Sequence, residues 1–403
     1  MSARSAGPEL AWSGVDSLWP PDACRRTRRP GTTPALLVLP NRRSPRLLVP
    51  TGVPSAATML SRHSRSRRQR LGQALLSRGV SSGVLSLLPV WRIVPHADGT
   101  GESSIQGYVR ARLPAAATVG ALLGPPRANA KPVLRIFDDT GRTIAFGKVG
   151  HTDLAGALVR HEHQALQDLR GAGFTHLEPP KVLHCGSWRG MDVLLLEALG
   201  SSDRAEPSWE LPASAMYELA EHAGVTSAAV GDSSYLHRLR ERGAALPPAS
   251  PVHGCLEVVT RRTAHTQVSF GRWHGDWAPW NMGSCSDPVP LWDWERSQVD
   301  VPLGFDVVHF ILQEEFKDRA GARAAVSAVR ERSSAVLSRW YGDREQVDAT
   351  VLLYLCEILT RYVADGGADP APALRTRIET ITTMFSLFPD IADNTAEESH
   401  ADA

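Results

Sequence analysis

The stretch Trp273–Glu295 reads WHGDWAPWNMGSCSDPVPLWDWE, and the rest of the chain is interpreted outward from it. It holds Asp276, then Asn281 five positions later, then Asp293 after a further twelve. Its glycines and prolines favour loops and turns over a continuous helix. A loop that supplies Asp and Asn, followed by a hairpin that supplies a second Asp, brings oxygen ligands together from two sides. Such a set suits Mg²⁺, so the stretch predicts a magnesium site.

Each of these residues also has a structural interpretation when it is taken alone. Asp-x4-Asn in a loop commonly forms an Asx turn or a helix cap, and Asp293 fits a solvated turn acid. His274 is better explained as a structural hydrogen-bonding group than as a proton carrier. We expect the tryptophans of the stretch to pack around the loop: Trp273, Trp277, Trp280, Trp292 and Trp294. The order and spacing of the three polar residues together favour the metal site.

The run His274-Gly275-Asp276-x4-Asn281, followed by Asp293-Trp294-Glu295, resembles the catalytic and metal-binding segments of the aminoglycoside phosphotransferase and choline kinase-like family. That family is similar in fold to the protein kinases, whose loop reads H-R-D-x4-N. The resemblance implies that Asp276 is the catalytic base and that Asn281 and Asp293 bind Mg²⁺. It also implies that Asp306 supports the loop by accepting backbone hydrogen bonds. Glycine in place of the protein kinase arginine favours the branch that acts on small molecules.

A lysine and a glutamate earlier in the chain form a second candidate pair. Lys148 lies in a predicted strand over 143–149, and a predicted helix over 153–170 carries Glu162 on its apolar face. Burying an unpaired carboxylate is costly, so Glu162 needs a cation, and Lys148 is the expected partner. The resemblance implies that Lys148 holds the α- and β-phosphates of ATP or GTP. A glutamate at a helix boundary and a lysine on a strand edge are the alternative.

The resemblance places the adenine-binding hinge at 194–199. Backbone groups make such contacts, so Glu197 and Leu199 are named only as neighbours of the nucleotide.

In the same family the first hairpin covers the phosphates with backbone N–H groups. This chain offers only Gly120 and Gly124 there, beside two prolines that donate nothing, with Arg127 or Lys131 as sources of charge. The segment departs from the family pattern, and a plain hairpin turn is the favoured interpretation.

The predicted fold class is α+β, with the bilobal protein kinase-like fold that the resemblance implies: an antiparallel-sheet lobe with one helix, then a mainly helical lobe. The predicted segments are a disordered basic tail (1–72), a mixed prelude (73–115), the N-terminal lobe (116–203), the helical C-terminal lobe with the catalytic loop (204–390) and a disordered tail (391–403).

Charge is unevenly distributed along the 403 residues. Residues 1–70 hold 13 arginines and three acids, so they carry +10, and the remainder carries −9 of a net +1. An unstructured tail, or a non-native start upstream of Met59, is favoured over a basic arm that binds nucleic acid or membrane. We therefore expect no nucleic-acid partner.

The five cysteines are odd in number and contain no C-x-x-C pair. This argues against a disulfide framework or a zinc site and indicates a reducing, cytoplasmic compartment. No apolar stretch approaches eighteen residues, so we expect no membrane partner.

The predicted function is a small-molecule kinase. It transfers the γ-phosphoryl of ATP or GTP, with Mg²⁺, to a hydroxyl of an aminoglycoside-, sugar- or amino-alcohol-like acceptor. Acidic and basic residues are mixed over 205–268, where the family shapes its acceptor pocket, so charge does not select one acceptor. The alternative is a catalytically silent kinase-like module that binds a nucleotide or a partner, which the poor phosphate loop favours.

Overall fold

The computed structural model describes residues 12–31, 33–60, 67–96, 102–124, 131–200, 210–283, 287–318 and 321–388. The chain forms two compact units, each considered by itself. Unit 1 comprises residues 1–167 and 180–203, and unit 2 comprises residues 168–179 and 204–403. The predicted tail over 391–403 and Arg127 lie outside the described residues.

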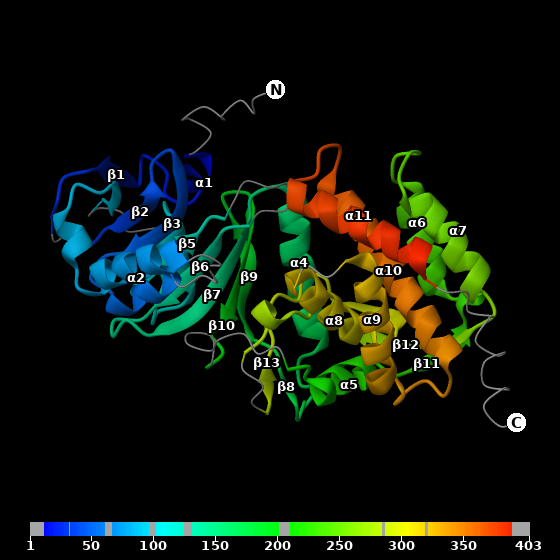
Figure 1. Cartoon of the computed structure of the whole chain (residues 1–403). Helices are drawn as coiled ribbons and strands as arrows, with labels where there is room; N and C mark the ends of the chain where they lie inside the picture. Colours follow the sequence, from blue (N-terminus) through cyan, green and yellow to red (C-terminus); the bar gives the residue numbers. More distant parts are fainter. Residues whose placement is uncertain are drawn as a thin grey trace, which may run out of the picture. The chain divides into compact units, whose positions relative to one another are not determined.

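A nine-stranded sheet, antiparallel at every pairing, organises unit 1 (Figure 1). In spatial order its strands are β1 (Cys24–Thr27), β4 (Arg92–Pro95), β2 (Leu36–Asn41), β3 (Ser44–Pro50), β5 (Thr118–Leu122), β6 (Val133–Phe137), β7 (Thr143–Gly150), β10 (Met191–Glu197) and β9 (Val182–Trp188). The last five form the predicted N-terminal sheet. The first four come from the segment predicted to be a tail and prelude.

Two long helices, α2 (Arg67–Ser81) and α4 (Asp153–Asp168), accompany this sheet with several short ones: α1 (Ser13–Asp16), η1 (Pro54–Leu60), η2 (Val84–Leu87) and α3 (Ile105–Arg112). Local sequence sets where they begin. Ser104 accepts a hydrogen bond from the N–H of Gly107 (3.3 Å) at the start of α3. Thr152 accepts one from the N–H of Ala155 (3.2 Å) at the start of α4.

The prediction of a disordered tail over 1–72 is wrong for residues 24–50, which form three strands of the sheet. The apolar run Leu36–Leu39 shows no polar alternation because both faces of β2 are buried. Leu36 and Val38 lie in one core cluster, while Leu37 and Leu39 lie in a second cluster that also contains residues of η1. The predicted lobe over 116–203 contains one helix, α4, as expected; α1 and η1 belong to the earlier segment and help to cover the faces of its added strands.

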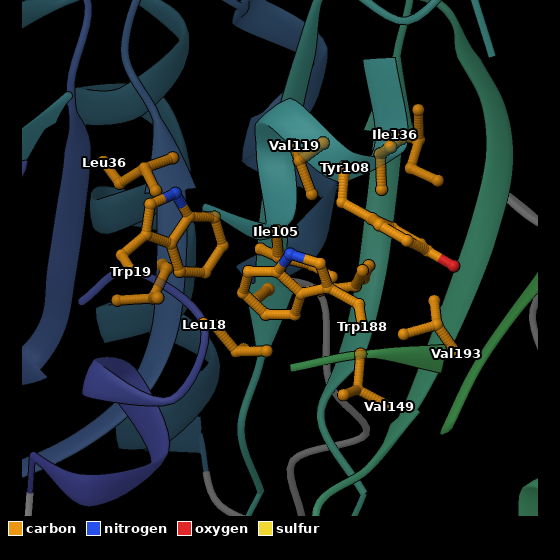
Figure 2. Packing of buried hydrophobic residues seen from close by; sticks show 14 of the residues in the cluster. Leu18, Trp19, Leu36, Ile105, Tyr108, Val119, Ile136, Val149, Trp188 and Val193 are labelled. Carbon is orange, nitrogen blue, oxygen red and sulfur yellow. The ribbon is translucent and has the colours of Figure 1, made fainter. Parts of the chain in front are cut away.

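The first cluster joins the added segment to the predicted lobe. Figure 2 shows Leu18, Trp19 and Leu36 in one core with Trp188 and Val193 of the last two strands. Unit 1 is therefore built around a core to which both parts of its sequence contribute.

Unit 2 is mainly helical, as predicted (Figure 1). Its helices are α5 (Ala213–His222), α6 (Ser234–Ala244), α7 (Val252–Thr263), α8 (Phe305–Asp318), α9 (Ala322–Leu337), α10 (Arg344–Gly366) and α11 (Pro372–Leu387), with short turns η3 (Val230–Asp232) and η4 (Pro279–Asn281). α10 is buried from Val347 to Thr360, which is why its sequence lacks a clear polar face. No described helix is long and apolar enough to cross a bilayer.

Two small sheets complete unit 2. Strands β11 (Thr226–Ala229), β12 (Gln267–Trp273) and β14 (Gln298–Pro302) pair antiparallel, and β8 (Leu177–Glu178) pairs parallel with β13 (Val289–Pro290). Residues 226–229 form a strand through tertiary pairing with β12, which local propensity does not report.

Candidate active site

The candidate catalytic loop connects two adjacent strands, β12 and β14, of a small sheet in unit 2. Strand β12 ends at Trp273, which pairs with Gln298 at the start of β14. The 24 residues between them, 274–297, therefore project from one end of a paired ribbon. Ser297 donates a hydrogen bond to the carbonyl of Trp273 (2.8 Å), which closes the base of this excursion.

Asp306, at the start of α8, holds the first turn of the loop. Its Oδ2 accepts from the N–H of His274 (2.7 Å), and its Oδ1 accepts from the N–H of Gly275 (3.1 Å). The predicted supporting role of Asp306 is thus confirmed. Burial raises the pKa of this carboxyl to about 7, while the two N–H donors oppose that rise.

Only glycine fits at position 275. Its φ is +88°, and a Cβ placed there would lie 2.2 Å from the carbonyl oxygen of Arg296. The carbonyl of Gly275 in turn accepts a hydrogen bond from Arg361. The departure from the protein kinase arginine at this position therefore has a steric cause in this chain.

Asp276 is surrounded by donors on both carboxylate oxygens. The Nδ2 of Asn281 donates to Oδ2 and to the carbonyl of Asp276, at 2.9 Å each. Oδ1 lies 3.3 Å from Nε2 of His309 and 3.8 Å from Nη2 of Arg361. Burial would raise the pKa of Asp276, but His309 and the Arg361 charge outweigh it and hold that pKa below its usual range. The side chain is still 36% exposed, so one side of an ionised carboxylate is open to an incoming group.

His309 continues this network inward. It is fully buried on α8, and its Nδ1 lies 2.7 Å from the hydroxyl of Tyr354 on α10. Burial lowers the pKa of His309 and raises that of Tyr354, so both groups are neutral near pH 7. A neutral tyrosine donates its proton to Nδ1, which leaves Nε2–H directed toward Asp276.

The sequence interpretation missed both His309 and Arg361. His309 follows Asp306 by three positions on one helix, so it shares the face that supports the loop, and this spacing was a usable signal. Arg361 lies on α10, far along the chain, and only the tertiary structure brings it to Gly275 and Asp276.

Asn281 and Asp293 are brought together by a hairpin. The N–H of Trp292 donates to the carbonyl of Asn281 (3.0 Å), and the N–H of Gly283 donates to the carbonyl of Pro290 (2.8 Å). The second half of the hairpin is secured by β8, because the N–H of Val289 donates to the carbonyl of His176 (2.8 Å). The two predicted metal ligands therefore stand on adjacent, hydrogen-bonded segments.

The donor set of this hairpin suits a hard cation. Because the Nδ2 of Asn281 bonds to Asp276, its amide oxygen is the group left to bind a metal. Asp293 adopts a φ of +77°, and its carboxylate has an oxygen within 4.8 Å of one from Glu295. Two carboxylate oxygens at this separation can bind one cation together. These residues therefore fit Mg²⁺, with Glu295 as a third oxygen donor that the sequence interpretation did not assign.

In unit 1, the predicted pairing of Lys148 with Glu162 is confirmed. Nζ of Lys148 on β7 lies 2.7 and 2.5 Å from the two oxygens of Glu162 on α4. Glu162 is fully buried and Lys148 is 9% exposed. A buried pair with both oxygens engaged holds the ammonium in one position.

The remaining nucleotide-site candidates have structural partners. Glu197 ends β10, where its N–H donates to the carbonyl of Lys181 (2.9 Å) and its carboxylate pairs with that lysine's Nζ (3.3 Å). Leu199 is buried. A Cβ at Gly120 would lie 2.7 Å from Sδ of Met59 and 3.0 Å from the carbonyl oxygen of Leu48, so this glycine packs closely against other parts of unit 1. That finding agrees with the plain-hairpin interpretation of its segment.

The loop's aromatic residues mostly pack, as predicted. Trp273, Trp277 and Trp294 are buried, whereas Trp280 is 44% exposed. The ring of His274 stacks edge-on against Trp294 at 4.7 Å, and its Nδ1 accepts from the N–H of Asp276 (3.3 Å). His274 is thus a structural hydrogen-bonding residue, as the sequence indicated.

No family model and no curated protein sequence matches this chain. Among solved structures it is similar to a GDP complex of aminoglycoside 2'-phosphotransferase-IIIa, at 13% identity and a TM-score of 0.44 over 69% of this chain and 96% of the other. It is also similar to an ethanolamine kinase from Plasmodium vivax, at 11% identity and a TM-score of 0.42 over 81% and 96%. A third is a putative fructosamine-3-kinase from Haemophilus somnus 129PT, at 15% identity and a TM-score of 0.39 over 70% and 96%. At these values no assignment of a reaction rests on the similarity.

Proposed function

We propose that this protein is a phosphotransferase that moves the γ-phosphoryl group of ATP or GTP to a hydroxyl of a small molecule. The observation that carries the proposal is the environment of Asp276. An ionised, partly exposed carboxylate sits on a loop clamped by Asp306, with Asn281 on one oxygen and His309 and Arg361 near the other. Phosphoryl transfer needs positioned charge more than covalent chemistry, and this arrangement supplies positioned charge.

Each unit contributes a distinct part in this proposal. In unit 1, Lys148, fixed by Glu162, binds the α- and β-phosphates, while backbone groups near Glu197 and Leu199 contact the base. In unit 2, Asn281, Asp293 and Glu295 would hold Mg²⁺ through oxygen atoms. When bound, the ion neutralises phosphate charge and orients the transferred group.

Asp276 acts on the acceptor. Its carboxylate accepts a hydrogen bond from the acceptor hydroxyl and so aims that oxygen at the γ-phosphorus. Because its pKa is held low, Asp276 is a weak base, and it receives the proton late, when the new P–O bond has made the hydroxyl acidic. Orientation is therefore the larger part of its role, which agrees with the loose transition state of phosphoryl transfer.

The acceptor class within this proposal is an aminoglycoside, sugar or amino alcohol. Asp276 offers one partly exposed carboxylate, which suits a single acceptor hydroxyl on a small molecule. The second candidate function, a silent nucleotide-binding module, has its support in the phosphate hairpin, where Gly120 serves packing.

A nucleotide-release assay on the full chain separates the two. ADP or GDP formation is followed with Mg²⁺ and a panel of aminoglycosides, sugars, amino alcohols and hydroxy amino acids. Asp276→Asn should lower acceptor-dependent turnover by about 10²–10⁴-fold, because it removes a positioned general base, with nucleotide affinity retained. Asp287→Asn is the matched control, because Asp287 is an exposed acid of the same stretch whose carboxylate contacts His176.

Turnover that survives in Asp276→Asn, or falls equally in Asp287→Asn, would show that the mechanism is wrong. Mg²⁺-dependent nucleotide binding without release across the whole panel would instead support the silent module.

A further inference from the structure

Exposed aliphatic side chains gather at one place in unit 1. Of the ten large hydrophobic residues that are exposed in the described part of the chain, five fall within residues 75–88. They are Leu75 and Leu76 on α2, and Val84, Leu87 and Leu88 on or beside η2, and together they are called the leucine patch. Single exposed leucines are ordinary on protein surfaces, but a cluster of them indicates an interaction surface.

The two elements that carry the leucine patch adjoin one another. α2 and η2 are in contact, and a Cβ placed at Gly79 of α2 would lie 2.9 Å from Cγ of Leu85 in η2. Val80, one turn after Leu76 on α2, is buried in the second core cluster with residues of β2 and β3. The residues of the leucine patch are the exposed aliphatic residues of these two contacting elements.

The backbone of the turn at Leu87 and Leu88 is fixed by hydrogen bonds from a buried arginine. Arg92 is 2% exposed, and its Nη2 donates to the carbonyls of Ser86 and Leu88 at 3.0 Å each. Its Nη1 donates to the carbonyl of Gly31 (3.3 Å). A buried guanidinium thus fixes the backbone on which the exposed leucines stand.

The segment that carries this patch is rich in arginine. Between Asp22 and Asp98 the sequence contains 14 arginines and no acidic residue. Arg28 and Arg29 are exposed, and Arg28 Nε donates to the carbonyl of Pro89 (2.9 Å), which places these cations beside Leu88. Arg78 is exposed on α2, between the two groups of patch residues along the chain.

We propose that the leucine patch and its flanking arginines dock unit 1 onto an anionic phospholipid surface. Aliphatic side chains enter the boundary between headgroups and acyl chains, while arginines bind the lipid phosphates. The arginines alone would suit nucleic acid equally. The aliphatic side chains decide the choice, because nucleic-acid surfaces use polar readout and aromatic stacking. This differs from the sequence expectation of no membrane partner, and it is independent of the phosphotransferase proposal.

Co-sedimentation of the full chain with vesicles tests the proposal. Vesicles of phosphatidylcholine alone are compared with vesicles containing about one-third phosphatidylglycerol, which supply the negative surface potential. The protein should bind the anionic vesicles and not the neutral ones, and added salt should weaken binding.

Paired substitutions identify the surface. Leu87→Ser with Leu88→Ser should lower vesicle partitioning roughly tenfold, because two inserted side chains are lost. Arg28→Gln with Arg29→Gln should lower it by about fivefold for each charge. Leu183→Ser is the matched control, since Leu183 on β9 is 42% exposed and lies outside the patch. Thermal unfolding of each variant verifies that it is folded.

Wild-type protein that stays in the supernatant with anionic vesicles would overturn the proposal. Vesicle binding that is unchanged by Leu87→Ser with Leu88→Ser but weakened by Leu183→Ser would overturn it as well. Binding of duplex DNA or RNA in place of vesicles, insensitive to the leucine substitutions, would assign the surface to nucleic acid. Self-association that the leucine pair abolishes, with no vesicle binding, would assign it to a second copy of this chain.

Discussion

At the scale of single residues, the contact of His309 with Asp276 helps to keep the candidate base ionised. Burial raises the pKa of Asp276, and His309 and Arg361 lower it further than burial raises it. Asp276 is therefore ionised throughout the range from pH 5 to pH 8 where such reactions are assayed.

Removing the N–H donor at His309 should raise the pKa of Asp276. In His309→Leu the pKa of Asp276 rises, because burial is then opposed only by the remaining charges. A base is active when it is deprotonated, so the acid limb of the kcat/KM profile should move to higher pH. His309→Gln retains an N–H donor and should restore most of the wild-type profile. The same pH profile in His309→Leu and the wild type would contradict this role.

The Lys148–Glu162 pair is the second prediction at this scale. Both groups are buried and in direct contact, so each single change should lower the free energy of unfolding by about 3 kcal/mol. The double variant Lys148→Met with Glu162→Gln should cost less than the two single changes together. Denaturant unfolding of the four proteins forms a double-mutant cycle, and additive costs would show that the pair is not coupled. A binding titration should separately show weaker nucleotide affinity in Lys148→Met.

At the scale of elements, the catalytic loop depends on a backbone conformation that one residue type allows. Gly275→Ala places a Cβ 2.2 Å from the carbonyl of Arg296 at a φ of +88°. We expect a loss of about 2 kcal/mol or more in unfolding free energy, from strain and overpacking together. Gly254→Ala in α7 is the control, since no atom lies within 4 Å of its added Cβ and alanine favours helix. Equal stabilities of the two variants would contradict the steric argument.

The hairpin that joins Asn281 to Asp293 carries a prediction for metal binding. Asp293→Ala should weaken Mg²⁺-dependent nucleotide binding by at least about tenfold, because a carboxylate ligand to the ion is removed. Binding in the absence of Mg²⁺ should change little. Isothermal titration with and without the metal measures both, and unchanged Mg²⁺-dependent affinity would show that Asp293 is not a ligand.

At the scale of the whole molecule, the described residues between 12 and 60 contribute side chains to the core of unit 1. Deleting residues 1–60 removes β1, β2 and β3 and leaves Val119, Trp188 and Val193 without part of their packing. We expect such a chain to aggregate or to unfold at least 10 °C below the full chain, since several buried side chains are lost at once. Deleting residues 391–403 is the comparison, and we expect it to leave the melting temperature unchanged. A truncated chain that melts like the full one would contradict a shared core.

The sequence alone indicated the candidate catalytic residues and the division into a sheet lobe and a helical lobe. Asp276, Asn281 and Asp293 could be identified as candidates because they lie close together in the sequence, at spacings typical of a polar loop. Glu162 was identifiable because a carboxylate on an apolar helix face requires a partner, and that partner is Lys148.

Only the tertiary structure decided the rest. Arg361 reaches the loop from α10, and the strand at 226–229 exists through its pairing with β12, because contacts between distant segments leave no local pattern. The strands over 24–50 were predicted as a tail because the segment is rich in arginine. Its apolar run, Leu36–Leu39, forms a strand because both faces of that strand are buried in core clusters. The exposure of Leu87 and Leu88 likewise depends on the hydrogen bonds by which Arg92 fixes their backbone, and the amino-acid composition does not reveal these contacts.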